Sequence, residues 1–249
     1  MKKLFIILIL LSTNAIAGGG SGVPLRDVKW PFDGAFGTVD RTAAQRGYQV
    51  YKEVCASCHA LEYISYRNLK EIGFSEAEVK AIAAEATVID GPNDDGDMFE
   101  RPGRLSDRFV SPFANEKAAR AVNGGAYPPN LSLIVKSRPN GANYLYSLLT
   151  GYQDAPGSME MNEGMYYNKY FSGNQIAMAP PLMDEIVEYM DGTHPSVDQM
   201  ARDVTIFLQW AAEPEMEQRK RMGIKVFAYL IIFTILFYLA KKIIWRDIK

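Results

Sequence analysis

The chain has 249 residues, 48% of them hydrophobic and 22% charged, with two cysteines, two histidines and a formal net charge of −2. This length provides for at least one domain with a sizeable core. Two cysteines exclude a disulfide-dense scaffold, and without an excess of basic residues we expect no nucleic-acid partner.

The first 17 residues have the pattern of a secretory signal peptide. Lys2 and Lys3 precede the apolar run 4–11, and the small residues Ala15 and Ala17 mark a cleavage site. The apolar run is far shorter than the ~20 residues that cross a bilayer. We therefore expect cleavage after Ala17 and export of the chain that follows.

The stretch Cys55-Ala56-Ser57-Cys58-His59 contains both cysteines of the chain and one of its two histidines. Cys-x-x-Cys-His is the spacing by which a c-type haem is attached. Two thiols on one face of a helical turn can each bond a vinyl group, while the next histidine reaches the iron. We therefore expect one covalent haem c, bonded by Cys55 and Cys58, with His59 as an axial iron ligand.

Two other uses of the cysteine pair are disfavoured. A structural zinc site needs about four nitrogen or sulfur ligands, and outside the motif the chain offers only His194. A thioredoxin-like redox pair should follow a strand, whereas residues 42–54 have apolar side chains at helical spacing.

The remaining exported chain predicts helices joined by long loops. Apolar periodicity and capping residues place helices at residues 42–54, 75–86, 115–122, 143–150 and 196–213. Segments 91–112 and 151–173 are rich in Gly, Pro, Asn and Asp and show no alternating strand pattern. We expect an all-α fold, a c-type cytochrome haem domain with long loop insertions.

Near the C-terminus, residues 226–240 carry no charge, and the apolar stretch extends over about 223–245. That length suits one membrane-spanning helix, with lysines that can snorkel at both ends and Trp245 at the interface. A buried core helix is the alternative, but both flanks are too basic for it.

The flanking charges are equal in number on the two sides and do not decide the orientation. The signal peptide does: we expect 18–218 to form the exported haem domain and 219–249 the membrane anchor with a short cytoplasmic tail. The predicted location is the cell inner membrane, with a single pass and the haem domain on the periplasmic side.

The exported part is acidic although the whole chain is nearly neutral. Residues 18–218 contain 17 Lys plus Arg and 28 Asp plus Glu, a net charge of −11. Solubility alone accounts for part of this excess. The other interpretation is electrostatic steering of a positively charged soluble partner. The densest acidic run consists of Glu85, Asp90, Asp94, Asp95, Asp97 and Glu100.

A haem that only carries electrons needs a second strong axial ligand. His194 lies in a polar, turn-like segment and is interpreted as a surface residue. The methionine candidates are residues 159, 161, 165, 178, 183, 190 and 200. Met178 is favoured because Pro180 and Pro181 restrict the backbone after it, but spacing alone leaves the choice open.

Several segments together resemble the cytochrome c1 family, the membrane-anchored haem subunit of ubiquinol–cytochrome c oxidoreductase, in its bacterial type. They are spread along most of the mature chain and are residues 46–59, 90–99, 101–107, 118–121, 127–132, 147–152, the Met178 loop, 210–215 and 219–223. This set is far more specific than Cys-x-x-Cys-His alone.

The resemblance implies roles for individual residues. Met178 would be the sixth ligand, and the carbonyl of Pro129 would accept a hydrogen bond from the free ring nitrogen of His59. Arg138 and Tyr144 match positions that contact a haem propionate. Asn123 matches a further position in the haem pocket.

The resemblance also implies a place in the cytochrome bc1 complex. The chain would accept one electron from the Rieske iron–sulfur protein and pass it to a soluble or anchored cytochrome c, beside cytochrome b in a dimeric membrane complex. It would be the electron-transfer subunit of an enzyme, with no substrate chemistry of its own. Two alternatives remain: a freestanding membrane-anchored cytochrome c that serves an oxidase, and a haem enzyme with an open sixth position.

Overall fold

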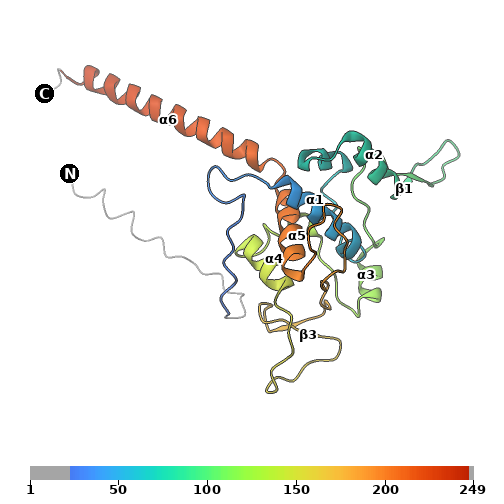
Figure 1. Ribbon diagram of the computed structural model, residues 1–249. Coiled ribbons are helices and arrows are strands. Elements are labelled where there is room, and N and C mark those ends of the chain that lie inside the picture. Colours follow the sequence, from blue (N-terminus) through green and yellow to red (C-terminus); the bar gives the residue numbers. More distant parts are fainter. Residues whose placement is uncertain (1–22, 247–249) are drawn as a thin grey trace.

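A computed structural model describes residues 23–246, so the signal peptide predicted at 1–17 lies outside the described residues. Helices joined by long loops form one domain, and a single long helix, α6, projects from it (Figure 1). The predicted fold class is confirmed: the chain is a mostly helical haem-type domain followed by one long apolar helix.

The centre of the domain is the crossing of α1 (Arg41–Val50) and α5 (Val197–Ala212). Asp40 and Ser196 cap their N-termini through side-chain oxygens that accept backbone N–H groups. At the crossing, a Cβ on Gly47 would lie 2.0 Å from the backbone oxygen of Asp203. Only glycine permits this approach of the two backbones.

Aromatic rings fill the space beside the crossing. Tyr48 lies on α1, and Tyr51 lies on the turn that continues it. The ring centroid of each tyrosine is 5.7 Å from that of Phe207 on α5 and 6.2 Å from that of Phe109. All four side chains are buried. Burial of a large apolar side chain stabilises the fold by about 1.5–3 kcal/mol, so this cluster is a major part of the core.

A buried ion pair joins the same two helices. Arg46 donates to both carboxylate oxygens of Asp203, at 2.8 and 3.1 Å, and Asp203 is 1% exposed. Gln199 donates to the same carboxylate, and Arg46 also bonds Asp191 in the loop before α5. A carboxylate is tolerated at this depth because its oxygens are satisfied and its charge is paired.

The other predicted helices form within a few residues of their expected bounds. They are α2 (Glu76–Ala84), α3 (Glu116–Val122) and α4 (Gly141–Leu149). Two 3₁₀ helices that the sequence did not predict lie at Tyr66–Ile72 and Leu131–Leu133. Ser75 forms the predicted capping box with Glu78 at the start of α2.

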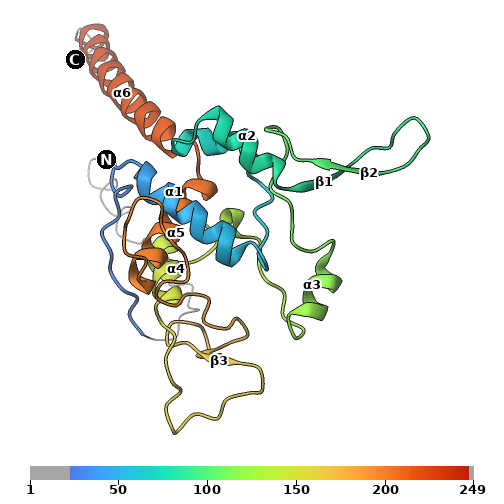
Figure 2. The same cartoon turned by 45° about the vertical axis from the view of Figure 1, so that its right-hand side comes forward.

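The expectation of no strands is wrong in two places. β1 (Thr87–Asp90) pairs with β2 (Phe99–Pro102), and β3 (Tyr166–Tyr167) pairs with β4 (Gln175–Ile176), both antiparallel. Both sheets lie in loops at the surface. Their strands do not bury a fully apolar face, so they lack the alternation of apolar and polar residues by which a strand is predicted from sequence. The β1–β2 hairpin projects on the side of the domain away from α6 (Figures 1 and 2).

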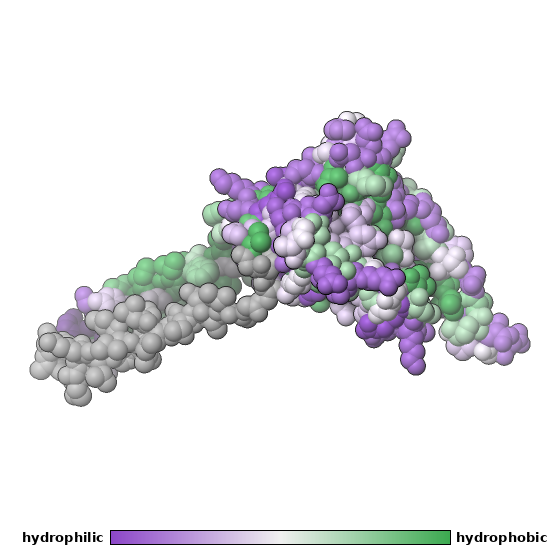
Figure 3. Space-filling view, turned by 90° about the horizontal axis from the view of Figure 1, so that it is seen from below, coloured by the Kyte–Doolittle hydropathy of each residue, from purple (hydrophilic) through white to green (hydrophobic). Residues whose placement is uncertain are grey.

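Helix α6 (Met216–Ile244) begins earlier than the expected start near 223. Its first turn still belongs to the domain: Met216 is buried, and the Glu217 carboxylate accepts the backbone N–H of Val39 at 3.0 Å. The most apolar 18 residues of the helix have a mean hydropathy of 2.1 and are all unburied, so α6 is long and apolar enough to cross a membrane. Figure 3 shows this apolar arm beside a mainly hydrophilic domain surface.

Gly47→Ala is expected to lower the free energy of unfolding by roughly 2 kcal/mol or more, because the new methyl group meets the α5 backbone. Thermal unfolding of the haem-loaded chain measures the change. Gly157→Ala is the matched control, since nothing lies within 4 Å of a Cβ at that position. Equal melting temperatures for the two variants would contradict the close crossing.

Candidate functional site

The Cys-x-x-Cys-His stretch is positioned by the C-terminal end of α1. The helix continues as one π-helical turn (Tyr51–Cys55), in which the Ala56 N–H bonds the Tyr51 carbonyl at 2.8 Å. The N–H groups of Cys58 and His59 then both bond the carbonyl of Cys55. The motif is therefore a tight turn fixed directly to the α1–α5 core.

The imidazole of His59 is oriented by the segment that precedes α4. Its Nδ1 lies 2.8 Å from the carbonyl oxygen of Pro129. Because a carbonyl can only accept, Nδ1 carries the proton and Nε2 is left as the basic nitrogen. The Leu131 N–H bonds the Ala60 carbonyl at 2.9 Å and ties the two segments together next to this contact.

Burial lowers the pKa of His59, against the opposing effect of the Pro129 carbonyl. The ring is therefore neutral at physiological pH, which is the protonation state that binds a metal. Tyr51 fixes the same residue from the core side, since its hydroxyl donates to the His59 carbonyl at 3.1 Å.

The two thiols are free and half-buried. Burial, with Cys58 nearby, raises the pKa of Cys55 to about 12. A nucleophilic or redox-active cysteine needs a lowered pKa and a positive neighbour, so this thiol has the opposite environment. Beside Cys58 lies a cavity of about 150 Å³, whose walls include Ala60, Phe113 and Tyr127.

Met178 lies in the loop after β4 and is half-buried. The hydroxyl of Tyr152 donates to the Met178 carbonyl at 3.0 Å. Burial raises the pKa of Tyr152, so the hydroxyl keeps its proton and remains a donor. This contact ties the Met178 loop to the segment that follows α4.

Behind this contact, the side chain of Asn168 is fully buried. Its amide donates to the Leu148 carbonyl at 2.8 Å, and its side-chain oxygen accepts the N–H of Tyr170 at 3.0 Å. Tyr152 pairs with Asn168 as an isolated β-bridge. This satisfied buried amide therefore supports the long loops around the short β3–β4 pair.

The other predicted pocket residues make different contacts. Arg138 and Tyr144 lie together: burial raises the pKa of Tyr144, and the Arg138 guanidinium opposes that rise. Asn123 instead donates its amide to the Ala119 carbonyl at the end of α3, at 2.7 Å. His194 is exposed, as predicted for a surface residue.

The thiol, imidazole and thioether groups of these residues suit a covalent haem. Two free thiols project from one turn, a neutral imidazole has Nε2 available, and a half-buried thioether lies on a loop held by its backbone. In the described part of the chain, no group of three or more His, Cys, Asp or Glu side chains could hold a separate metal ion.

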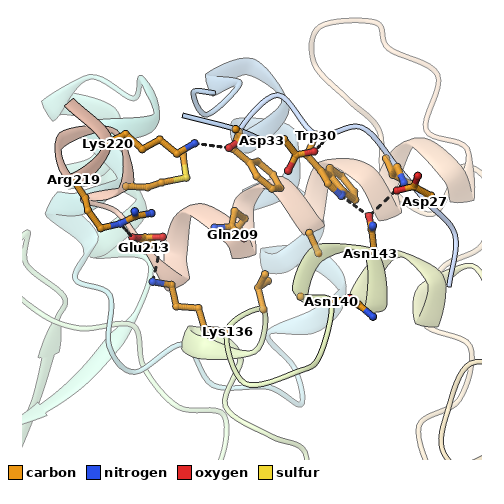
Figure 4. A pocket seen from close by; sticks show the side chains of 17 residues that line it. Asp27, Trp30, Asp33, Lys136, Asn140, Asn143, Gln209, Glu213, Arg219 and Lys220 are labelled. Atoms are coloured by element: carbon orange, nitrogen blue, oxygen red, sulfur yellow. Dashed lines mark hydrogen bonds and ion pairs between the residues drawn. The ribbon is translucent and has the colours of Figure 1, made fainter. Parts of the chain in front are cut away.

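The larger cavity, of about 410 Å³, lies elsewhere, between the N-terminal segment, α4, α5 and the start of α6 (Figure 4). Ion pairs of Glu213 with Lys136 and Arg219 border it. It is lined by neither the cysteines nor His59, so this cavity is separate from the candidate haem site.

The model of the cytochrome c1 family matches residues 30–248 of the chain. The chain belongs to the cytochrome c1 family. It is 46% identical to cytochrome c1 of Rhodospirillum rubrum, in an alignment that covers 97% of this chain and 95% of that protein.

Two further relatives extend this comparison. The chain is 50% identical to the cytochrome b/c1 protein of Bradyrhizobium diazoefficiens, over 94% of this chain and 37% of that protein. It is 45% identical to the mitochondrial cytochrome b-c1 complex catalytic subunit of Candida albicans, over 96% and 83% respectively. Family membership implies a covalently attached haem c and makes the chain an electron carrier.

Tyr152 and Asn168 were not singled out from the sequence. Tyr152 lies in a segment that resembles the family, but nothing in its spacing indicates that it contacts Met178. Asn168 lies between aromatic residues in a loop rich in polar side chains. A polar residue in such a loop is normally exposed, so only the structure shows it to be buried.

Asn168→Ala is expected to destabilise the loop by about 1–3 kcal/mol, because the Leu148 carbonyl and the Tyr170 N–H lose their buried partner. Limited proteolysis should then cleave between residues 151 and 183 faster than in the wild-type chain. Asn162→Ala changes an exposed residue in the same loop and should leave cleavage unaltered. Equal cleavage of both variants would refute the bracing role of Asn168.

Proposed function

We propose that this chain is the haem c electron carrier of a cytochrome bc1 complex, accepting one electron from the Rieske iron–sulfur protein and passing it to a c-type cytochrome. The observation that carries the proposal is the His59–Pro129 contact beside two free thiols, which leaves Nε2 as the one nitrogen for iron. Similarity to relatives named as parts of the cytochrome b-c1 complex supports the partners.

In this proposal Cys55 and Cys58 would hold the haem through thioethers, and His59 and Met178 would ligate its iron. When bound, the haem supplies one-electron chemistry by cycling between ferric and ferrous iron. The Pro129 carbonyl keeps the imidazole in one tautomer and orientation, and Tyr152 keeps the Met178 backbone in place. With both residues bound, the iron would keep no exchangeable ligand.

Arg138 and Tyr144 are proposed to bind a haem propionate. Their proximity gives a guanidinium and a hydroxyl that can both donate to one carboxylate. Asn123 is proposed as a wall of the same pocket. Its amide already bonds the α3 backbone, so its role would be to shape the wall rather than to donate to the haem.

The proposed docking surface for the cytochrome c partner is the tip of the β1–β2 hairpin. Asp94, Asp95 and Asp97 are exposed there, and Glu100 is exposed on the adjoining strand β2. Two other members of the acidic run are paired within the chain: Asp90 with Arg101, and Glu85 with Lys52. The unpaired charge therefore concentrates at the hairpin tip, where it can steer a basic partner.

Helix α6 is proposed to cross the cell inner membrane once, with the haem domain on the periplasmic side and cytochrome b beside the helix in a dimeric complex. The length and hydropathy of α6 support the crossing. Within the enzyme the chain transfers electrons and makes or breaks no substrate bond.

Purification of the affinity-tagged full chain from membranes in mild detergent tests this assignment. We expect cytochrome b and a Rieske protein to elute with it, and quinol to reduce its haem in that preparation. Elution of the haem-loaded chain alone, still reducible by membranes, would favour the freestanding oxidase donor instead.

Raising the ionic strength should slow the reaction with a basic cytochrome c, since the Debye length falls from about 30 Å at 0.01 M to about 8 Å at 0.15 M. The triple variant Asp94→Asn, Asp95→Asn, Asp97→Asn should react more slowly at low salt and lose most of the salt dependence. Stopped-flow mixing measures both.

The control for this experiment removes the same charge elsewhere, by Asp154→Asn, Glu160→Gln and Glu163→Gln at exposed positions of another loop. It should keep the wild-type salt profile. A flat profile for the wild-type chain, or equal losses in both variants, would rule out steering by the hairpin.

A further inference from the structure

The loop before α1 is tied directly to the start of the proposed membrane helix. Lys220, on α6, donates to the carbonyl oxygens of Phe32 at 2.5 Å and of Gly37 at 3.0 Å. Figure 4 shows its side chain pointing toward the segment that carries Asp33. Together with the Glu217–Val39 contact, this fixes loop 33–37 against the first turns of α6.

One large apolar side chain of this loop is left in solvent. Phe36 is 84% exposed, whereas Trp30 and Phe32 just before it are 7% exposed and stacked at 5.5 Å. A phenylalanine this exposed lacks the stabilisation of about 1.5–3 kcal/mol that burial of its side chain would give. Since the loop is tied at both of its ends, Phe36 cannot fold back into the core without breaking the Lys220 contacts.

The depth of Lys220 relative to a bilayer follows from helix geometry. The uncharged run 226–240 covers about 22 Å at 1.5 Å per residue, which is short of the ~30 Å hydrocarbon core. The core must therefore extend two or three residues beyond each end, to about residue 223. Lys220 then lies about 5 Å outside it, within a headgroup layer about 5–8 Å thick.

We propose that Phe36 inserts into the outer lipid interface as a second membrane contact of the domain. Aromatic and long apolar side chains favour this interfacial layer. Arg219 and Arg221 are paired with Glu213 and Glu217, but Lys225, one turn further along α6, can snorkel to the interface and suits anionic headgroups. With α6 as one fixed point and Phe36 as another, the domain cannot rotate freely about the helix. The inference rests on the proposed membrane crossing of α6.

Photo-crosslinking of the haem-loaded full chain in nanodiscs of phosphatidylethanolamine and phosphatidylglycerol tests this contact. p-Benzoylphenylalanine replaces one residue at a time: Phe36, Phe237 in the middle of α6, or Met98 on the β1–β2 hairpin. All three are exposed, so the replacement does not disturb the core. Mass spectrometry then identifies phospholipid adducts.

We expect phospholipid adducts at positions 36 and 237 and no adduct at position 98. An adduct at 237 without one at 36 overturns the Phe36 contact and leaves the membrane crossing of α6 intact. No adduct at 237 contradicts the crossing itself. Equal adducts at 36 and 98 overturn the inference as well, because the crosslinking would then not report depth.

Discussion

The close crossing of α1 and α5 at Gly47 is the constraint on which the rest of the structure depends. α1 runs directly into the turn that carries Cys55, and α5 is followed within a few residues by α6. The same contact therefore fixes the turn proposed to bind haem and the candidate membrane helix to each other. The Arg46–Asp203 pair and the ring cluster around Phe207 reinforce it from both sides.

Long loops complete the site, and buried polar contacts give them their rigidity. The Pro129 carbonyl orients His59, and Tyr152 and Asn168 hold the backbone around Met178. Each contact satisfies a donor that would otherwise be buried without a partner, which makes the loop positions specific. An electron carrier benefits from such rigidity, because its iron ligands should move little between oxidation states.

Local chemistry explains which parts of the fold were predictable. The Cys-x-x-Cys-His spacing, the capping boxes and the apolar stripes are short-range signals, and they located the haem turn and the main helices. The β1–β2 hairpin was not predicted, because its strands are exposed and are joined by a long loop without the two-residue turn typical of hairpins. The early start of α6 was not predicted, because its first turn contacts a segment far away in the sequence, where the Val39 N–H bonds the Glu217 carboxylate.

For the site, residue type and spacing indicated His59 and the cysteines but left Met178 among several methionines. Resemblance to the family selected it, and the structure adds a backbone contact that spacing could not show. Long-range partners such as Pro129 for His59, or Tyr152 for Met178, depend on how loops far apart in sequence meet.

Carbon monoxide binding to the ferrous chain tests the central claim most directly, because the gas enters only an open or weakly held sixth position. The account predicts no carbon monoxide spectrum for the wild-type chain or for Met183→Ala, which changes an exposed methionine in the same loop. It predicts ready binding for Met178→Ala with the haem still attached. Binding by the wild-type chain, or a Met178→Ala variant that stays closed, would contradict the account.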